Sequence, residues 1–326
     1  MMIIIPNIDG KIWNIEQHTI DIVDCVINQR PLQISLNSEG PDAGELGLYS
    51  LLDNICDRYS YPKQNITITT CNQLESHSEY SIHIQPPLFF MSAQQFASQN
   101  QSPEKTFGDN FKHFGLFVGR SNWLRLWLGS YLHKNYLDKT ALTFHYDSSL
   151  DFHRPHLGLD DLVRFNPGQI EELDPTNLIA KCPIIDQAVE SYPILTPAHF
   201  NISKIYHTFF LEIVCETYCR GNSFFPTEKI WRPIINRTPF IVQGPRDYIK
   251  NLHRLGFKTF SNWFDESHSH DEYSYQPMGI CSTLDRLALC STVELEGMYI
   301  DMSNTLDHNY QVMMSLTDAK VIKVFE

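Results

Sequence analysis

The 326-residue sequence has no hydrophobic run of the ~20 residues that a membrane-spanning helix requires. The opening stretch Met1–Pro6 is apolar but too short for a signal-peptide core, and no basic residues precede it. Basic residues are scarce, because 25 Lys and Arg stand against 38 Asp and Glu, for a net charge of −13. Sequence-independent binding to nucleic acid depends on neutralising phosphates, so no nucleic-acid partner is expected. We expect a cytoplasmic protein with at most peripheral membrane contact.

Motifs of several large enzyme classes are also missing. The sequence contains no GxSxG, Walker A, HExxH or kinase signatures, and no GxGxxG follows its strands, which argues against these classes. Eight cysteines are scattered without a CxxC pair, so reduced thiols are expected. Apolar material is plentiful: 42% of the residues are hydrophobic and 12% aromatic, which suffices for two sizeable cores.

Apolar runs alternate with helical patterns along the chain. This alternation predicts parallel sheets covered by helices on both faces. We expect an α/β fold with two Rossmann-like lobes and a ligand cleft between them, in three parts: an acceptor-side lobe (1–105), a nucleotide-sugar-binding lobe (106–275) and a mainly helical segment (276–326). The polar stretch 92–105 is expected to be a surface connection. Strands are predicted at 2–6, where the strand is expected to be buried, and at 66–70, 80–84, 113–120, 141–146, 210–215 and 239–243.

The densest group of polar residues follows the strand at 210–215. Glu216 comes at the end of this strand, and Thr227 then occupies the position of a helix cap just ahead of Glu228 and Lys229. A helix N-terminus suits a phosphate, and a lysine in its first turn is unfavourable for the helix dipole. The pattern therefore indicates an anionic ligand, with Glu228 accepting from ribose hydroxyls. The alternative is an ordinary helix cap with a solvated lysine.

Residues 225–229 have the sequence FPTEK. Glu216 and the Gly221 loop precede them, and a proline-led strand, TPFI at 238–241, follows them. This combination resembles the donor-binding segment of the α1,3-fucosyltransferase family. The strand and arginine-bearing helix at 117–131 resemble another part of that family, and the likeness covers roughly residues 113–266.

The resemblance implies a glycosyltransferase of the GT-B type. Lys229 and Arg125 would contact the donor's phosphates, Glu228 the nucleotide ribose, and Glu216 would lie near the donor sugar. Thr217 stands where the family has Asn, and Pro226 where it has Val, which leaves the identity of the sugar open.

Two other strand ends carry candidate residues. Arg120 follows the strand at 113–120 and precedes a helix, where a phosphate or sugar site or a plain helix cap is expected. His145 and Asp147 close the next strand, where ligands of α/β sheets gather. Either residue is a candidate general base, and Asp147 is a candidate nucleophile; the alternative is a pair that satisfies backbone groups. Asp9 and Glu45 are candidate bases on the acceptor side.

No resident metal or other cofactor is expected. The segment 265–272, DESHSHDE, combines carboxylates and imidazoles, but an exposed polar loop has the same composition. Asp160 and Asp161 are adjacent and do not form the Asp-x-Asp that metal-dependent glycosyltransferases use. We expect Lys229 and Arg125 to take the place of a cation at the leaving phosphate.

These features predict a transferase that moves a sugar from a nucleotide-activated donor to a glycan or glycolipid acceptor, in surface polysaccharide or lipopolysaccharide synthesis. One alternative is a retaining enzyme with Asp147 as nucleophile and a CMP-linked acidic sugar such as Kdo as donor. Another is a non-catalytic carbohydrate-binding protein.

Overall fold

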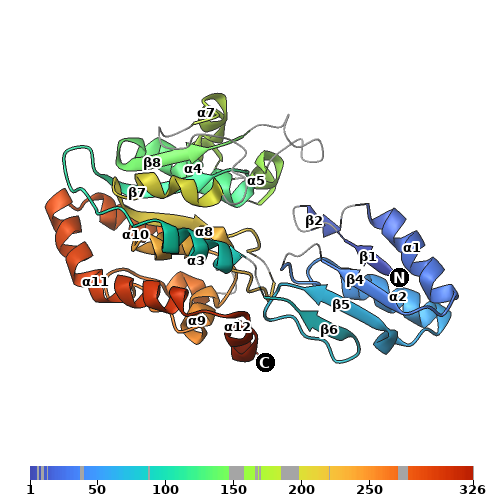
Figure 1. The fold of residues 1–326 in the computed structure, drawn as a ribbon. Helices are drawn as coiled ribbons and strands as arrows, with labels where there is room; N and C mark the ends of the chain where they lie inside the picture. The colour runs from blue at the N-terminus through green and yellow to red at the C-terminus, as the bar shows by residue number, and fades with distance from the viewer. Residues whose placement is uncertain are drawn as a thin grey trace. The chain divides into compact units, whose positions relative to one another are not determined.

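The computed structural model describes residues 1–5, 7–8, 11–12, 14–36, 40–86, 89–146, 158–165, 168, 170–184, 198–219, 221–270 and 278–325 (Figure 1). The protein is mixed α/β with two four-stranded parallel sheets, which confirms the predicted fold class at this level. It divides into two compact units, residues 1–88, 218–225 and 317–326 in the first, and 89–217 and 226–316 in the second. The domain ranges 1–105, 106–275 and 276–326 stay predictions.

The first unit contains a sheet with the strand order β1-β4-β5-β6. Because strand order follows chain order, right-handed crossovers place α1 and α2 on the same face, where they pack against each other. The elements of this unit are β1 (Met2–Ile4), β2 (Asn7–Ile8), β3 (Lys11–Ile12), α1 (Ile15–Ile27), β4 (Leu32–Ser35), α2 (Leu48–Tyr59), η1 (Lys63–Asn65), β5 (Ile66–Thr70), β6 (Ser81–Ile84) and α12 (Asp318–Phe325).

Side chains alternate between the two faces of this sheet. Ile3, Ile34 and Ile68 form one row across three strands and are buried in the core. On the other face of the edge strand β1, Met2 and Ile4 are 63% and 53% exposed. The expectation of a buried first strand, in a sheet covered on both faces, is therefore wrong for this unit. The reason is that both crossover helices share one face.

The second unit contains a sheet with the order β10-β9-β7-β8, and its strands are buried almost throughout. The crossover helices α4 and α8 lie on opposite faces, as right-handed connections in opposite directions require. Its elements are α3 (Phe89–Gln99), β7 (Lys112–Val118), α4 (Trp123–Asn135), η2 (Leu137–Lys139), β8 (Thr140–Phe144), α5 (Leu159–Phe165), α6 (Ile170–Leu173), α7 (Pro175–Ala180), η5 (Ala198–Ile205), β9 (Phe209–Cys215), α8 (Glu228–Ile235), β10 (Phe240–Gln243), α9 (Tyr248–Arg254), η6 (Ser267–His270), α10 (Met278–Ala288) and α11 (Thr292–Met314).

Helix α3 corrects one expectation. The polar stretch 92–105, expected to be a surface connection, begins inside this helix, which packs against α8 and α11. Phe90, Ala93 and Ala97 recur at helical spacing and are buried. None of the helices in the described parts of the chain is long and apolar enough to cross a membrane.

Candidate functional site

The carboxyl ends of the four parallel strands in the second unit meet at one edge of the sheet. From β7 the chain proceeds to β8 on one side, and from β9 to β10 on the other, so the strand order reverses between β7 and β9. Open α/β sheets bind ligands outside such a switch point. Arg120, His145 and Glu216 follow the ends of β7, β8 and β9, and this edge is the candidate functional site.

Arg125 bridges the two strand ends at the switch point. It lies in the first turn of α4, where its N–H donates to the side chain of the cap residue Asn122 at 3.0 Å. Its guanidinium donates to the carbonyl oxygens of Arg120 at 2.8 Å and of Cys215 and Glu216 at 3.2 Å each. Arg125 is only 8% exposed. These contacts hold a positive charge in one place beside the ends of β7 and β9.

The carboxylate of Glu216 accepts three hydrogen bonds inside the unit. The hydroxyl and the backbone N–H of Thr227 donate to it at 2.6 and 3.3 Å, and the hydroxyl of Tyr248 donates at 2.6 Å. Glu216 is 1% exposed. Its carboxylate thus connects the end of β9 to the beginnings of α8 and α9.

The first turn of α8 contains the predicted Thr227-Glu228-Lys229 motif. Thr227 is the N-cap, and its Oγ1 accepts the N–H of Lys229 at 3.3 Å. The Lys229 ammonium donates to Glu228 at 3.0 Å and to the hydroxyls of Thr217 and Thr227 at 3.1 Å each. The side chains of Lys229 and Glu228 are 16% and 11% exposed. An anion at this helix end would therefore have to replace contacts that Lys229 makes with the protein's own oxygens.

The side chains of the remaining predicted residues take no part in these hydrogen bonds. Arg120 joins it through its backbone carbonyl, while its side chain is exposed. His145 is buried after the end of β8, one strand away from the switch point. Its backbone N–H donates to the carbonyl oxygen of Val118 at 3.0 Å. Asp147 and Asp9 lie outside the described residues, so their roles stay predictions.

No known protein family, curated protein or solved structure matches this chain. The function is therefore inferred from the geometry of the site itself.

One residue of the site, Tyr248, was not predicted from the sequence. Tyr248 begins α9, directly after the loop that follows β10, and donates to Glu216 at 2.6 Å. Its place after a strand end is the only signal that marks it in the sequence. Cys215 ends β9, and burial raises the pKa of its thiol to about 12. The thiol is therefore protonated at neutral pH, which argues against cysteine chemistry at this strand end.

The Gly221 loop belongs to the first unit, whereas Glu216 and Lys229 belong to the second. The backbone N–H of Asn222 donates to Asp42 at 2.5 Å, and the hydroxyl of Ser223 donates to the carbonyl of Gly40 at 2.6 Å. The candidate base Glu45 is exposed and lies beside Gly221, since a Cβ on that glycine would meet Glu45 Cγ at 2.4 Å. The donor-binding segment implied by the resemblance is thus divided between two compact units.

The described part of the segment 265–272 contributes no metal-binding group. No cluster of three or more potential metal-ligating side chains occurs among the described residues. His268 is buried, and its Nε2 lies 3.1 Å from the carbonyl oxygen of Val242. The pKa of Asp265 is lowered by hydrogen bonds from the backbone and hydroxyl of Ser267. Both side chains are therefore engaged within the protein.

Proposed function

We propose that this chain is a glycosyltransferase that uses a nucleotide-activated sugar, with its donor site at the switch point of the second unit. The observation that carries the proposal is the position of the Lys229–Glu228 pair in the first turn of α8, beside the strand ends joined by Arg125. A two-lobed arrangement of the GT-B type is part of this proposal, and so is the cytoplasmic location.

Donor binding would exchange the partners of this ion pair. A diphosphate would take the place of Glu228 at the Lys229 ammonium, and the ribose hydroxyls would take the place of Lys229 at the Glu228 carboxylate. Lys229 and Glu228 would separate only as each gains a hydrogen-bond partner in the donor. Neither charge is then left unpaired at a site that is largely shielded from water. This exchange explains how a carboxylate next to the lysine is compatible with an anionic ligand.

The chemical step proposed here is transfer of the sugar to a hydroxyl of a glycan or glycolipid acceptor. Cleavage of the sugar–phosphate bond leaves negative charge on the nucleotide, which Lys229, Arg125 and the N–H groups of α8 would stabilise. The contacts of Glu216 favour a positioning role, because its carboxylate already accepts from Thr227 and Tyr248. A carboxylate of the first unit, such as Glu45, would accept the proton of the acceptor hydroxyl.

The proposal is tested by thermal unfolding in the presence of GDP, UDP, CMP, dTDP and ADP, each with magnesium and with EDTA. A nucleotide at about 100 times its Kd should stabilise the protein by about 2.7 kcal/mol. We expect one nucleotide to act in both conditions and its effect to be lost in Lys229→Ala. Lys250→Ala, which changes an exposed lysine on α9, is the matched control and should keep the full shift.

Other outcomes distinguish the alternatives. Stabilisation by GDP favours a fucosyltransferase-like donor, whereas stabilisation by CMP favours the Kdo-type enzyme, in which Asp147→Asn should abolish turnover. If no nucleotide stabilises the protein, or if Lys229→Ala responds like the wild type, the donor site is wrong and Thr227 is an ordinary helix cap. Stabilisation by glycans alone would favour the non-catalytic carbohydrate-binding protein.

A further inference from the structure

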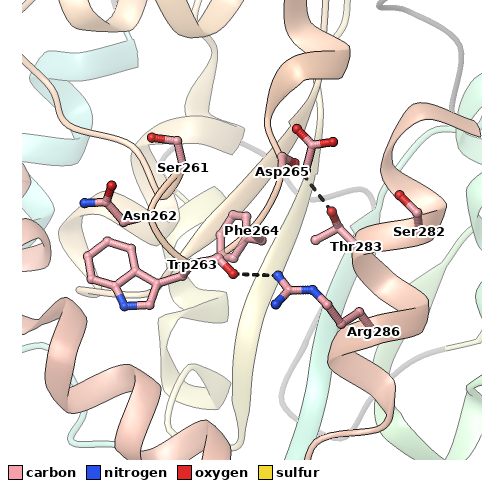
Figure 2. A pocket seen from close by; sticks show the side chains of 8 residues that line it. All are labelled: Ser261, Asn262, Trp263, Phe264, Asp265, Ser282, Thr283 and Arg286. Atoms are coloured by element: carbon pink, nitrogen blue, oxygen red, sulfur yellow. Dashed lines mark hydrogen bonds between the residues drawn. The ribbon is translucent and has the colours of Figure 1, made fainter.

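A shallow surface cavity of about 540 Å³, open to solvent, lies in the second unit, between the loop 261–265 and the helix α10 (Figure 2). Five of its eight lining residues are exposed, so it is an open site at the surface and not an enclosed pocket. Trp263, Asn262 and Asp265 line it from the loop, and Arg286 and Ser282 line it from the helix.

The wall formed by the loop is held in place without a ligand. The backbone N–H groups of Trp263 and Phe264 donate to the carbonyl oxygen of Phe260 at 2.9 and 3.1 Å. The backbone N–H of Phe260 donates to the carboxylate of the buried Glu266 at 3.2 Å. Figure 2 shows the Arg286 guanidinium directed at the carbonyl of Trp263, to which it donates a hydrogen bond. The backbone of this wall is therefore ordered before a ligand binds, which lowers the entropic cost of binding.

Two segments that flank the cavity contact the edge of the sheet opposite the proposed donor site. The ring of Phe260, which precedes the loop, packs at 5.1 Å against Phe240, the first residue of β10. After Arg286, the carbonyl of Cys290 lies 2.9 Å from Nε2 of His113 at the beginning of β7. These neighbours belong to the amino-terminal edge of the sheet, whereas Lys229 lies at the carboxyl edge.

The chemistry of the lining is that of a site for a neutral, hydroxyl-rich ligand. It contains the indole ring of Trp263, the phenyl ring of Phe264, an amide, a carboxylate, a guanidinium and hydroxyls. The amide of Asn262 can bind two neighbouring hydroxyls, and the indole of Trp263 supplies an apolar face. Asp265 and Arg286 can add the hydrogen-bond positions that Ser267 and the Trp263 carbonyl do not use. One positive and one negative charge cancel, and the ionised Asp265 would repel a phosphate.

We propose that this cavity binds a neutral sugar unit of a glycan, as a docking subsite separate from the donor site. Six of the eight lining residues are polar or charged, which argues against a lipid or steroid. The proposal does not depend on the proposed transferase activity, because a sugar can bind at this edge whether or not a nucleotide binds at the other.

Nuclear magnetic resonance of the tryptophan indole N–H groups tests this inference. The full chain contains five tryptophans, and Trp263→Phe identifies the signal of Trp263 by its loss. The probes are the methyl glycosides of glucose, galactose, mannose, fucose and N-acetylglucosamine, up to about 50 mM, well above the about 1 mM Kd of a weak site. We expect at least one glycoside to shift the Trp263 signal in a saturable manner.

Two variants and a control locate the sugar. Asn262→Ala and Asp265→Asn should each weaken the binding by about tenfold, the effect of one hydrogen bond to a charged or planar group. Asn304→Ala changes an exposed asparagine on α11 and should leave the binding unchanged. A Trp263 signal that no glycoside shifts would overturn the proposal. Binding as tight as in the wild type in both Asn262→Ala and Asp265→Asn would also overturn it. Tighter binding of adenosine or guanosine than of any glycoside would assign the cavity to a nucleoside and also overturn it.

Discussion

At the scale of single residues, the buried carboxylate of Glu216 organises the candidate site through Tyr248. The Tyr248 hydroxyl donates to it at 2.6 Å, and both residues are about 1% exposed. Tyr248→Phe removes this donor from the buried carboxylate. We expect a loss of about 1.5–3 kcal/mol in the free energy of unfolding, the contribution of a hydrogen bond to a charged group. Urea unfolding measures it, and an unchanged midpoint would show that the hydrogen bond contributes nothing.

Gly221 has a φ of +68°, which lies in the left-handed region. An added Cβ would meet Glu45 Cγ at 2.4 Å and Asp42 Oδ2 at 2.5 Å. Asp42 is itself held by the N–H of Asn222, so it cannot move freely. Gly221→Ala should therefore destabilise the first unit by more than the about 1–2 kcal/mol that the left-handed conformation alone costs an alanine.

Gly47 supplies the matched control for this prediction. Its φ is +74°, and an added Cβ would meet no atom within 4 Å. Gly47→Ala should show the backbone cost alone, in the same unit. If both variants lose equal stability in urea unfolding, the contact between the Gly221 loop and the acidic residues is not tight.

At the scale of elements, a buried ion pair joins β9 to α8. Arg232 on the helix donates to Glu212 on the strand at 2.9 Å, and the hydroxyl of Tyr206 also donates to this carboxylate. Arg232 is 4% exposed and Glu212 is fully buried. Burial raises the pKa of Glu212, while the positive charge of Arg232 opposes this shift. The pair therefore fixes the helix that carries Lys229 to the central strand.

Removing one partner of this pair should be costly. Arg232→Met removes the cation that is hydrogen-bonded to the buried Glu212 carboxylate, and we expect a loss of about 3–5 kcal/mol in unfolding free energy. The double variant Arg232→Met/Glu212→Leu removes both charges and should recover much of the loss. A double variant as unstable as the single one would mean that packing, and not the unpaired charge, is responsible.

The sequence predicts some helices and strands better than others. The strands of the second unit are continuous apolar runs such as HFGLFV at 113–118, because helices cover both faces of this sheet. Helix α3 escaped prediction because alanines form much of its buried stripe and Gln and Ser dominate its surface. Likewise, the cap at Thr227 follows from local sequence, whereas the contact of Tyr248 with Glu216 depends on how α9 packs.

At the scale of the whole molecule, the chain passes between its two compact units more than once. Residues 218–225 leave the second unit just after Thr217 and return to it at Pro226. Asn72 donates to the carbonyl of Asn222, 150 positions away in the sequence, and its side-chain oxygen accepts the N–H of Phe224 at 2.9 Å. Local patterns carry no information on pairings this distant, so the sequence alone suggested one continuous donor-binding segment.

Phe224 tests this division of the chain. It is fully buried, and its ring lies 5.2 Å from that of Phe325 in α12, which also belongs to the first unit. Phe224→Ala should cost about 3–5 kcal/mol, because it leaves a cavity between segments that are far apart in the sequence. We expect hydrogen exchange to become faster at the amides of β4 and β5, while those of β7 and β9 keep their protection. The same pattern in Phe325→Ala would support a single cooperative unit, built from all three segments. Faster exchange throughout β7 and β9 would contradict it, because the two units would then unfold together.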